Sequence, residues 1–477
     1  MLNTIIQRNK NPWPLLLAVS SILLLLRLAY IHFGPLGLGP DEAQYWDWSR
    51  MLDWSYVTKP PLTTWIMAAT TSILGDTLVG VRLFALLCQL ALPVLGFLIV
   101  KEARHTQAAW WAFALLTCLP IIATGGYIMT PDAPSLVCWF SAIYLLVRLE
   151  TRGQENWRTW LFVGLIIGIG GLAKPTIAFF YPCLGLYWLY CKTRGQTTKV
   201  ILKGIIAAGL ISLLCQAPVF YWNATHDWLM FQHVLDQADS DNRWQGLDSF
   251  LNFIGSQLLL VGPLLLPLIL INIKRFPLNI LWFFSIPIIV AFTCLSFFSK
   301  VQGNWPILGV SILIVLFACT APQWSNSFKK ALKAALGLNL ILILLIHYTD
   351  VLRPVLPPKA DPTKTLRGWK SAGQALEKAI TDTKIATIFT TRYQTTAQLA
   401  FHTPSQPTVY YMNPGWRRAK HHDFMELPNP LPQKILYASL TNYVPEKIVQ
   451  HFGSCQLYST HANEWRTLYI FRCNKEG

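Results

Sequence analysis

Two adjacent carboxylates and a nearby lysine are the residues of this chain best suited to chemistry. Asp41 and Glu42 stand in the stretch Gly39-Pro-Asp-Glu-Ala-Gln-Tyr-Trp, and Lys59 follows in the same loop, before a Pro-Pro pair. A carboxylate can take a proton from an incoming hydroxyl as a general base. A lysine can hold a phosphate leaving group and stabilise the charge that grows on it. Because a following proline favours extended backbone, it helps to direct the Lys59 side chain.

The segment before these residues predicts that the carboxylates lie at a membrane surface. An apolar run extends from Trp13 to Phe33, and about 20 such residues suffice for a helix to cross a bilayer. Asp41 and Glu42 follow where that span ends. After them, Tyr45 and several tryptophans alternate with charged residues, as in a helix that lies in the interface plane. For the aromatic residues alone, an ordinary interfacial belt is the better explanation.

The composition is that of a polytopic membrane protein. Of the 477 residues, 53% are hydrophobic and 13% are charged, whereas soluble domains average about 25% charged residues. The first run is too long for the core of a signal peptide and is followed by no cleavage site, so we expect it to remain in the mature protein. Apolar runs that predict about eleven transmembrane helices lie near residues 13–33, 80–100, 107–123, 133–149, 157–172, 175–191, 200–221, 250–272, 277–298, 304–320 and 330–348.

Charged residues alternate in sign between successive loops of this pattern. Lysines and arginines collect in one set of loops, and the opposite set holds most of the acidic residues, Asp41 and Glu42 included. The positive-inside rule therefore predicts a cytoplasmic N-terminus and an outer position for the Asp41 loop. An odd number of spans places the C-terminal part on the outer side as well. The formal charge of +16 is then mostly a topology signal, and we expect no nucleic-acid partner.

A change of composition near residue 350 divides the chain into two predicted domains. Residues 1–349 form the transmembrane domain, with a first outer loop at 34–79, and residues 350–477 are polar, begin with a proline-rich linker and carry no span. The predicted fold is mainly α, a polytopic membrane protein with a small C-terminal α/β domain on the outer face. Local patterns in that domain predict helices at 368–380 and 393–402 and strands at 384–390, 434–440 and 465–473.

Other polar residues on the predicted outer face are further candidates, because ionisable groups at membrane depth are costly. Asp132 opens the fourth span, where capping of the helix is an equally good explanation. Lys59 has the alternative of simply extending its amine to the surface. His226 could orient a ligand, although a single loop histidine is more often solvated. The remaining candidates are the cations Lys174, Arg243 and Lys300, which could hold phosphate, and Asn304 near a late span.

Nucleotide-binding motifs are absent from the sequence. A glycine-rich stretch with Gly164 and Gly168 lies inside an apolar span and follows no strand, so close helix packing explains it better than a dinucleotide loop. No Walker or kinase motif occurs. A group donor used on the outer face would therefore be carried by lipid, and a lipid-phosphate sugar fits the carboxylates and cations. The spans would form the groove for its prenyl chain.

Several motifs occur in order across residues 10–320: Gly39-Pro-Asp-Glu-Ala-Gln-Tyr-Trp, Lys59-Pro-Pro-Leu-Thr-Thr-Trp, Gly75-Asp-Thr-Leu-Val-Gly-Val-Arg-Leu, Thr130-Pro-Asp-Ala-Pro, Leu172-Ala-Lys-Pro-Thr, Pro218-Val-Phe-Tyr-Trp-Asn-Ala-Thr-His-Asp-Trp and Asn304-Trp-Pro. Together they resemble the motifs of the integral-membrane type-C glycosyltransferases, in the branch that includes the protein O-mannosyltransferases and the lipid A aminoarabinose transferase. The tail from Arg392-Tyr-Gln through Leu399-Ala-Phe to Gln406-Pro-Thr-Val-Tyr also resembles the outer domain of that family. The next segment, Gly415-Trp-Arg-Arg-Ala-Lys-His-His-Asp, departs from the Arg-x-Asn-Gln-Tyr-Asp pattern of closer relatives and leaves the acceptor open.

This resemblance implies both a reaction and roles for particular residues. Asp41 would be the catalytic carboxylate, Glu42 its partner, Asp132 a second acidic position and Lys59 the contact to the lipid phosphate. The implied reaction transfers a sugar, with inversion, from a polyprenyl-phosphate donor to an envelope acceptor: lipid A, a polysaccharide or a protein. It would take place at the outer, periplasmic face of a bacterial cytoplasmic membrane. The sequence requires no cofactor, and a divalent metal, present in some relatives, is left open.

Three alternatives compete with this interpretation. A transporter or flippase would use Asp41 and Asp132 to carry protons, but it would also show charges buried within spans and an internal repeat, and neither is found. A polysaccharide polymerase or ligase would use a lipid-pyrophosphate donor on the same face. A non-catalytic scaffold fits least well, because it gives no reason for the acidic pair and the lysine.

Two cysteines lie beyond the last predicted span, and we expect them to form a disulfide. They are Cys455 and Cys473, and the predicted topology places them in a compartment where disulfides persist. Neighbouring antiparallel strands could bring them together. A loop of this length corresponds to roughly 3 kcal/mol in the chain-entropy description. Two independent buried thiols are the alternative. The other eight cysteines lie in apolar runs and are explained as small buried hydrophobic residues.

Overall fold

The computed structural model describes residues 11–103, 106–153, 156–233, 235, 246–415, 421–424 and 426–475. The chain is mainly helical and has a small sheet near its C-terminus. Its internal contacts divide it into two compact units. The first unit comprises Met1–Tyr30, Lys59–Thr63 and Arg82–His347. The second unit comprises Ile31–Thr58, Thr64–Val81 and Tyr348–Gly477, so it contains most of the first predicted outer loop together with the C-terminal region.

Helices make up the first unit, and their lengths vary widely. Several are interrupted near prolines, which cannot donate a backbone hydrogen bond and so break the helical ladder. In chain order, the helices that lie wholly or mostly in this unit are α2 (Trp13–Phe33), α5 (Leu78–Glu102), α6 (Thr106–Thr117), α7 (Pro120–Gly125), α8 (Asp132–Arg152), α9 (Trp157–Gly171), η1 (Pro175–Phe179), α10 (Phe180–Thr193), α11 (Leu202–Cys215), α12 (Ala217–Thr225), α14 (Gly246–Val261), α15 (Leu265–Ile271), η2 (Ile273–Arg275), α16 (Ile280–Phe283), α17 (Ile286–Leu295), α18 (Ile307–Cys319), η3 (Ala321–Gln323) and α19 (Asn326–His347).

Four helices in the described part of the chain are long and apolar enough to cross a membrane: α2, α5, α8 and α19. The number rises to six if the bent pairs α11–α12 and α14–α15 each count as one span. Other apolar runs form helices of 10–17 residues, shorter than the roughly 20 that a straight crossing requires. These lengths do not confirm the predicted count of eleven, which stays a prediction.

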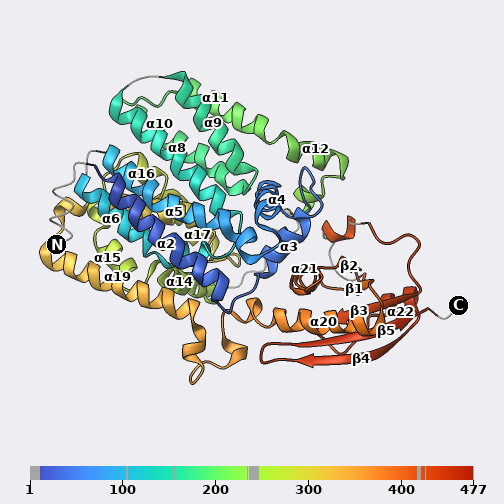
Figure 1. Ribbon diagram of the computed structural model, residues 1–477. Helices are drawn as coiled ribbons and strands as arrows, with labels where there is room; N and C mark the ends of the chain where they lie inside the picture. Colours follow the sequence, from blue (N-terminus) through green and yellow to red (C-terminus); the bar gives the residue numbers. More distant parts are fainter. Residues whose placement is uncertain are drawn as a thin grey trace. The chain divides into compact units, whose positions relative to one another are not determined.

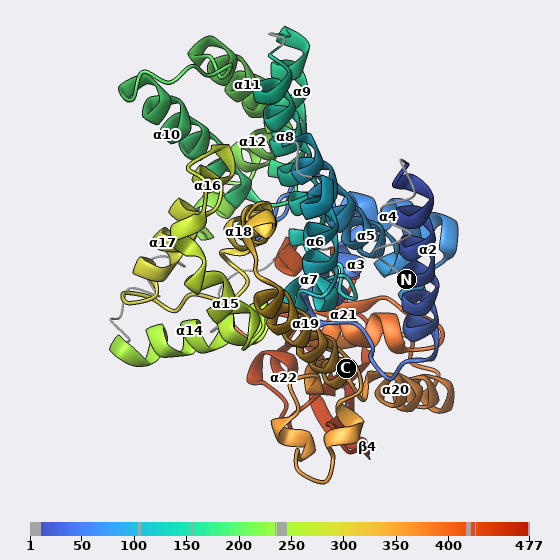
Figure 2. The same cartoon turned by 90° about the vertical axis from the view of Figure 1, so that its left-hand side faces the viewer.

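Helices α9 and α11 lie side by side in both views of the first unit (Figures 1 and 2). A Cβ atom on Gly164 would lie 2.7 Å from the Ala208 carbonyl oxygen, and one on Gly168 would lie 2.7 Å from the Cys215 side chain. The close approach also lets Ser212 Oγ donate to the Gly164 carbonyl at 2.7 Å. The prediction that these glycines serve helix packing is therefore confirmed.

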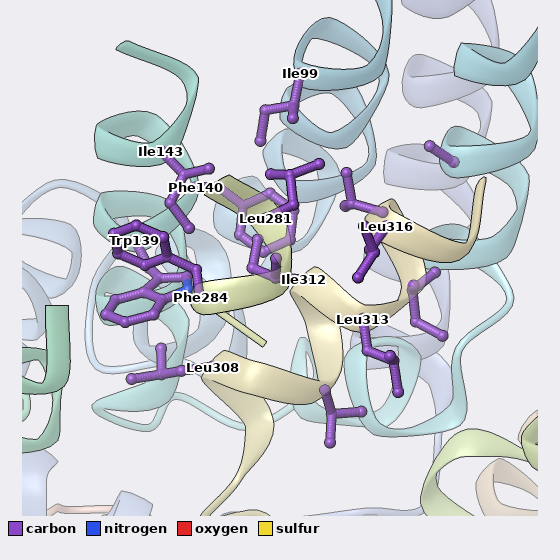
Figure 3. Close-up of a cluster of buried hydrophobic side chains, with 14 of the residues drawn as sticks. Ile99, Trp139, Phe140, Ile143, Leu281, Phe284, Leu308, Ile312, Leu313 and Leu316 are labelled. Carbon is purple, nitrogen blue, oxygen red and sulfur yellow. The ribbon is translucent and has the colours of Figure 1, made fainter. Parts of the chain in front are cut away.

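The core of the first unit is built around α18. Every residue from Ile307 to Cys319 is buried, as expected for a helix that is apolar on all sides. Side chains of α5, α8 and α16 meet it in one cluster, in which Trp139 lies edge-on to the Phe284 ring with centroids 5.4 Å apart (Figure 3). This packing fixes the position of α8, the helix that begins with Asp132.

A five-stranded mixed sheet organises the C-terminal part of the second unit (Figure 1). Its strand order is β2-β1-β3-β5-β4; β1 is parallel to β2 and β3, and β5 is antiparallel to β3 and β4. Helix α20 packs along β4 and β5. The elements of this unit are α3 (Pro40–Ser49), most of α4 (Leu62–Leu74), η4 (Thr349–Leu352), η5 (Pro358–Ala360), η6 (Lys364–Leu366), α20 (Trp369–Thr383), β1 (Ile388–Thr390), α21 (Tyr393–His402), β2 (Val409–Tyr411), η7 (His421–Phe424), β3 (Lys434–Ser439), α22 (Glu446–Phe452), β4 (Ser454–Ala462) and β5 (Thr467–Asn474).

The predicted disulfide is present in this sheet. Cys455 on β4 pairs directly with Cys473 on β5 across the antiparallel ladder, and their Cα atoms are 4.0 Å apart. Helix α21 also has the predicted bounds. Strand β2 and helix α22 were not predicted, because each is short and its pattern is weak without the neighbouring elements.

Candidate active site

Helix α3 of the second unit presents Asp41 at its first turn. Pro40 occupies the first helical position, where its missing N–H is not needed. Glu42 turns back so that its Oε2 accepts the Gly39 N–H at 3.0 Å, which closes the N-terminus. Residues Glu42–Trp48 are buried, whereas Asp41 is exposed. Within the described residues, the Asp41 carboxylate has no hydrogen bond or ion pair, so it is available to accept a proton.

Glu42 has a structural task in this arrangement. Its side chain is fully buried, and the contact with Gly39 fixes the start of the helix. A role as the catalytic partner of Asp41 stays a proposal.

Aromatic contacts hold the other end of α3 inside the second unit. Trp46 Nε1 donates to Asp76 Oδ1 at 2.7 Å, and its ring lies edge-on to Phe401 of α21 with centroids 4.9 Å apart. Trp48 stacks on Tyr56 with centroids 4.5 Å apart and an interplanar angle of 3°. Burial raises the pKa of Tyr56, so its phenol stays protonated. The candidate Tyr45 is buried beside Trp48 and is part of this packing.

A pair of histidines from η7 adds to these contacts. His422 Nε2 lies 2.9 Å from Asp47 Oδ2, and both residues are buried. The His421 ring lies edge-on to Trp48 and to Tyr56, with centroid distances of 5.3 and 4.6 Å. Sequence reasoning missed both histidines. The available signals were the His-His-Asp run in the segment that departs from the family pattern and the aspartates of the first outer loop.

The residues before α3 are tied to the C-terminal part of the same unit. Gln398 Nε2 donates to the Leu38 carbonyl at 2.8 Å, and the Gly37 N–H donates to the Leu366 carbonyl at 2.9 Å. A Cβ on Gly37 would lie 2.9 Å from the His402 ring, so a larger residue would force the two segments apart. The position of α3 therefore depends on residues more than 300 positions away in the sequence.

A second polar group lies in the first unit, around Asp132. Lys174 Nζ is 2.5 Å from Asp132 Oδ1, and Asn304 Nδ2 donates to Asp132 Oδ2 at 3.0 Å. Both carboxylate oxygens thus have partners. The segment that begins at Lys59 joins the same region, because the Leu62 N–H donates to the Leu172 carbonyl at 2.9 Å. Lys59 is half-buried.

A cavity of about 230 Å³ lies beside this group. Its wall is mostly apolar, with Leu92, Ile121 and Leu136 among the lining residues, and Asp132 and Asn304 contribute polar side chains. A cavity with an apolar wall and a few polar groups is typical of a ligand site.

The remaining candidates differ in what surrounds them. Lys300 is exposed, and no contact of its side chain connects it to Asp132 within the described residues. The His226 ring stacks on Trp222 with centroids 4.2 Å apart, and its Nδ1 lies 2.9 Å from the Trp222 carbonyl oxygen, so it packs on the end of its own helix. Arg243 lies outside the described residues.

Among the described residues, no group of three or more His, Cys, Asp or Glu side chains is arranged to hold a metal ion.

Comparison with known proteins finds that this chain is similar to glycosyltransferases. The family model described as dolichyl-phosphate-mannose-protein mannosyltransferase matches residues 58–222. A lipid A galacturonosyltransferase of Rhizobium johnstonii is 24% identical over 347 residues, which is 71% of this chain and 71% of that protein. The chain is thus similar in sequence to these two kinds of sugar transferase. The resemblance inferred from the motifs is thus confirmed.

Two further relatives extend the comparison. An undecaprenyl phosphate-α-4-amino-4-deoxy-L-arabinose arabinosyl transferase of Pseudomonas fluorescens is 26% identical over 255 residues, covering 48% of this chain and 46% of that protein. The match therefore spans less than half the length of that transferase. The crystal structure of ArnT from Cupriavidus metallidurans, bound to undecaprenyl phosphate, superposes with a TM-score of 0.69 at 14% identity and covers 97% of this chain and 98% of that one. The chain therefore has the ArnT fold.

Proposed function

We propose that this protein is a glycosyltransferase that moves a sugar from a polyprenyl-phosphate donor to an envelope acceptor. The single observation that carries the proposal is the exposed carboxylate of Asp41, which has no hydrogen bond or ion pair within the described residues and precedes the buried stretch Glu42–Trp48. The relatives support the substrate class, since they are transferases for lipid A and for undecaprenyl-phosphate sugars by name. Lipid A, or a saccharide attached to it, is the acceptor we propose first.

The proposed reaction is one displacement at the anomeric carbon. Asp41 takes the proton of the acceptor hydroxyl, and the hydroxyl oxygen forms the new bond to that carbon. The bond from the anomeric carbon to the phosphate oxygen breaks at the same time, and the phosphate leaves with the electron pair. Lys59 stabilises the charge that develops on the phosphate. A single displacement inverts the configuration of the sugar.

Asp132, with Lys174 and Asn304, is proposed to bind and orient the donor. A carboxylate that a lysine and an amide hold in place is well oriented, and its remaining lone pairs can accept hydrogen bonds from sugar hydroxyls. Arg243 and Lys300 are proposed only as further cations for phosphate on the same face, and Glu42 and Tyr45 as supports of the Asp41 helix.

Membrane topology is part of the proposal. Eleven spans, a cytoplasmic N-terminus and a periplasmic C-terminal domain, residues 350–477, would place Asp41 where a lipid-linked donor is exposed. The supporting observation is the sign alternation of charged residues between loops. Cysteine labelling of a variant with one added surface cysteine at Lys384, using an impermeant maleimide on intact spheroplasts, should label that position from outside.

Whether transfer requires a divalent metal can be tested directly. We propose no step that requires one, and dialysis against EDTA should leave transfer by the purified protein unchanged. Loss of activity that returns with Mg²⁺, Mn²⁺ or Zn²⁺ would show a requirement.

The decisive test uses purified protein in detergent, with undecaprenyl-phosphate sugars and lipid A. We expect mass spectrometry to detect a glycosylated lipid A and free undecaprenyl phosphate in equal amounts. Undecaprenyl pyrophosphate as the product would instead identify a polymerase or ligase. Movement of the donor between leaflets of proteoliposomes without a glycosylated product would identify a flippase.

A further inference from the structure

We propose that His422 is a positioning residue that holds the Asp41 helix in its working orientation through its hydrogen bond to Asp47. The inference rests on the proposed function, in which Asp41 is the general base. His422 touches neither the donor nor the acceptor in this proposal. It acts through α3, whose last turn it holds while Asp41 stands at the first.

The contact between His422 and Asp47 is short, and both side chains are buried. His422 Nε2 and Asp47 Oδ2 are 2.9 Å apart, and the side chains are 0% and 10% exposed. A hydrogen bond between such groups is stronger in a low-dielectric interior than in water. Loss of one partner would leave a polar or charged group buried without compensation, which costs far more than the net gain of the bond. The pair therefore favours one position of Asp47 strongly over its alternatives.

A displacement at Asp47 would reach Asp41 because both belong to one short helix. Six residues separate them, or about 9 Å along the axis at 1.5 Å per residue. Residues Glu42–Trp48 are all buried, so the helix moves as a unit rather than bending. A shift of about 1 Å in a reacting group can cost about 100-fold in rate. A small tilt of α3 is therefore enough to misplace the Asp41 carboxylate.

The surroundings of the pair contain few other charges. Arg50 Nη1 lies 4.0 Å from Asp47 Oδ1 at the exposed end of α3. The rings of Tyr393 and Tyr411 lie 6.0 Å from the His422 ring, from α21 and β2 respectively. The neighbouring His421 and Asp423 belong to η7 itself. Among the described residues, only His422 lies within hydrogen-bond distance of a carboxylate oxygen of Asp47.

His422 lies in the stretch Gly415–Asp423, the segment that departs from the family pattern. Its neighbour His421 covers the Trp48–Tyr56 stack from the same short helix. Helix η7 thus supplies both the ring contacts and the hydrogen bond to Asp47.

The test compares His422→Ala, His422→Gln, Asp47→Ala and the double alanine variant. Transfer should be measured with the donor and acceptor concentrations varied separately. The assay temperature should be at least about 15 °C below the unfolding midpoint, because a loss of 1 kcal/mol lowers the midpoint of a small domain by roughly half that amount. For His422→Ala we expect kcat to fall about 10- to 100-fold, with both KM values nearly unchanged. His422→Gln should recover most of the loss, because its amide N–H can occupy the place of Nε2. Asp47→Ala and the double variant should be no slower than His422→Ala alone.

His451→Ala is the matched control. His451 is a half-buried histidine of the same unit whose Nδ1 lies 2.8 Å from the Lys447 carbonyl oxygen, on α22 rather than on η7. The His451→Ala variant should have lower thermal stability and an unchanged kcat. Unchanged kcat in His422→Ala would overturn the inference, and so would a kcat loss that the glutamine variant fails to recover although it restores thermal stability. Failure of the proposed function would look different, since the wild-type protein itself would then transfer no sugar.

Discussion

The two carboxylates proposed for the reaction differ in what already holds them. Asp132 in the first unit has both oxygens engaged, one by Lys174 at 2.5 Å and the other by Asn304 at 3.0 Å. Asp41 in the second unit is exposed and has no partner among the described residues. A carboxylate whose two oxygens already accept hydrogen bonds has less room for an incoming hydroxyl group. A carboxylate without such partners keeps its capacity to accept a proton.

Two acidic residues that are adjacent in the sequence can therefore have different roles in the structure. Glu42 is adjacent to Asp41, yet it is buried and closes the start of the helix through Gly39. A pair of neighbouring acids is thus divided into one residue that builds the helix and one that the helix presents. The predictions below test this division, beginning with the variant for which we expect the largest effect.

Asp41→Asn should lower kcat about 10²- to 10⁴-fold, the usual contribution of a general base. The amide keeps the shape of the side chain but cannot take the proton. Because Asp41 is exposed, the melting temperature should stay unchanged. Steady-state transfer assays together with thermal unfolding in the same detergent provide the measurement. Asp53→Asn, in the same loop, is the control and should retain activity. An Asp41→Asn variant with near wild-type turnover would show that another group takes the proton.

Lys59→Ala should lower kcat/KM for the donor about 10- to 100-fold, because a hydrogen bond to a charged group contributes about 1.5–3 kcal/mol. Lys59→Arg should recover only part of the loss, since a planar guanidinium does not replace a point charge. Kinetics with the donor and acceptor varied in turn distinguish the role. A loss confined to the acceptor's KM would contradict the phosphate contact, and no loss at all would favour a lysine that merely extends to the surface.

Much of this architecture was predictable from residue patterns. The helix Tyr393–His402 has the predicted bounds, because its residues show helical periodicity. Cys455 and Cys473 pair as predicted, because the predicted topology places them in a compartment where disulfides persist. The position of the loop that holds Asp41 was also predictable, because an apolar run long enough to cross a membrane, Trp13–Phe33, ends shortly before it. These are properties of short segments, which a single sequence records well.

The contacts that support α3 could not be predicted in the same way. Asp47 and His422 are 375 positions apart, and no pattern in either segment specifies the other. The same holds for Gln398 with the Leu38 carbonyl. Division of the chain at residue 349 could likewise not reveal that the first loop shares a compact unit with the C-terminal region. Such pairings are decided by packing of the whole chain rather than by local preference.

Asp132→Asn should have a mixed effect that is smaller in rate than that of Asp41→Asn. Loss of the charge leaves Lys174 without its partner, so we expect a loss of about 1–3 kcal/mol in the free energy of unfolding. Transfer should also slow, because the donor loses an oriented hydrogen-bond acceptor. Lys174→Ala provides the matched variant, since it removes the other half of the same pair. Lower thermal stability with fully preserved turnover in both variants would reduce Asp132 to a structural role at the start of α8.

Cys455→Ser should have the smallest effect on transfer, although it weakens the fold of the second unit. The disulfide joins β4 to β5, at the end of the sheet order β2-β1-β3-β5-β4 that is farther from β2. The elements that contact α3 are α21 and η7, which flank β2 in sequence, so loss of the bridge should not shift Asp41. The expected loss in the free energy of unfolding is roughly 3 kcal/mol by the chain-entropy description. Thermal unfolding with and without a mild reductant gives the measurement: reductant should lower the melting temperature of the wild type and leave Cys455→Ser unchanged. Cys294→Ser, which alters an exposed free thiol of the first unit, should behave like the wild type. A fall in kcat for Cys455→Ser as large as that for His422→Ala would mean that the whole sheet, rather than the contacts at η7 and α21, determines where the base stands.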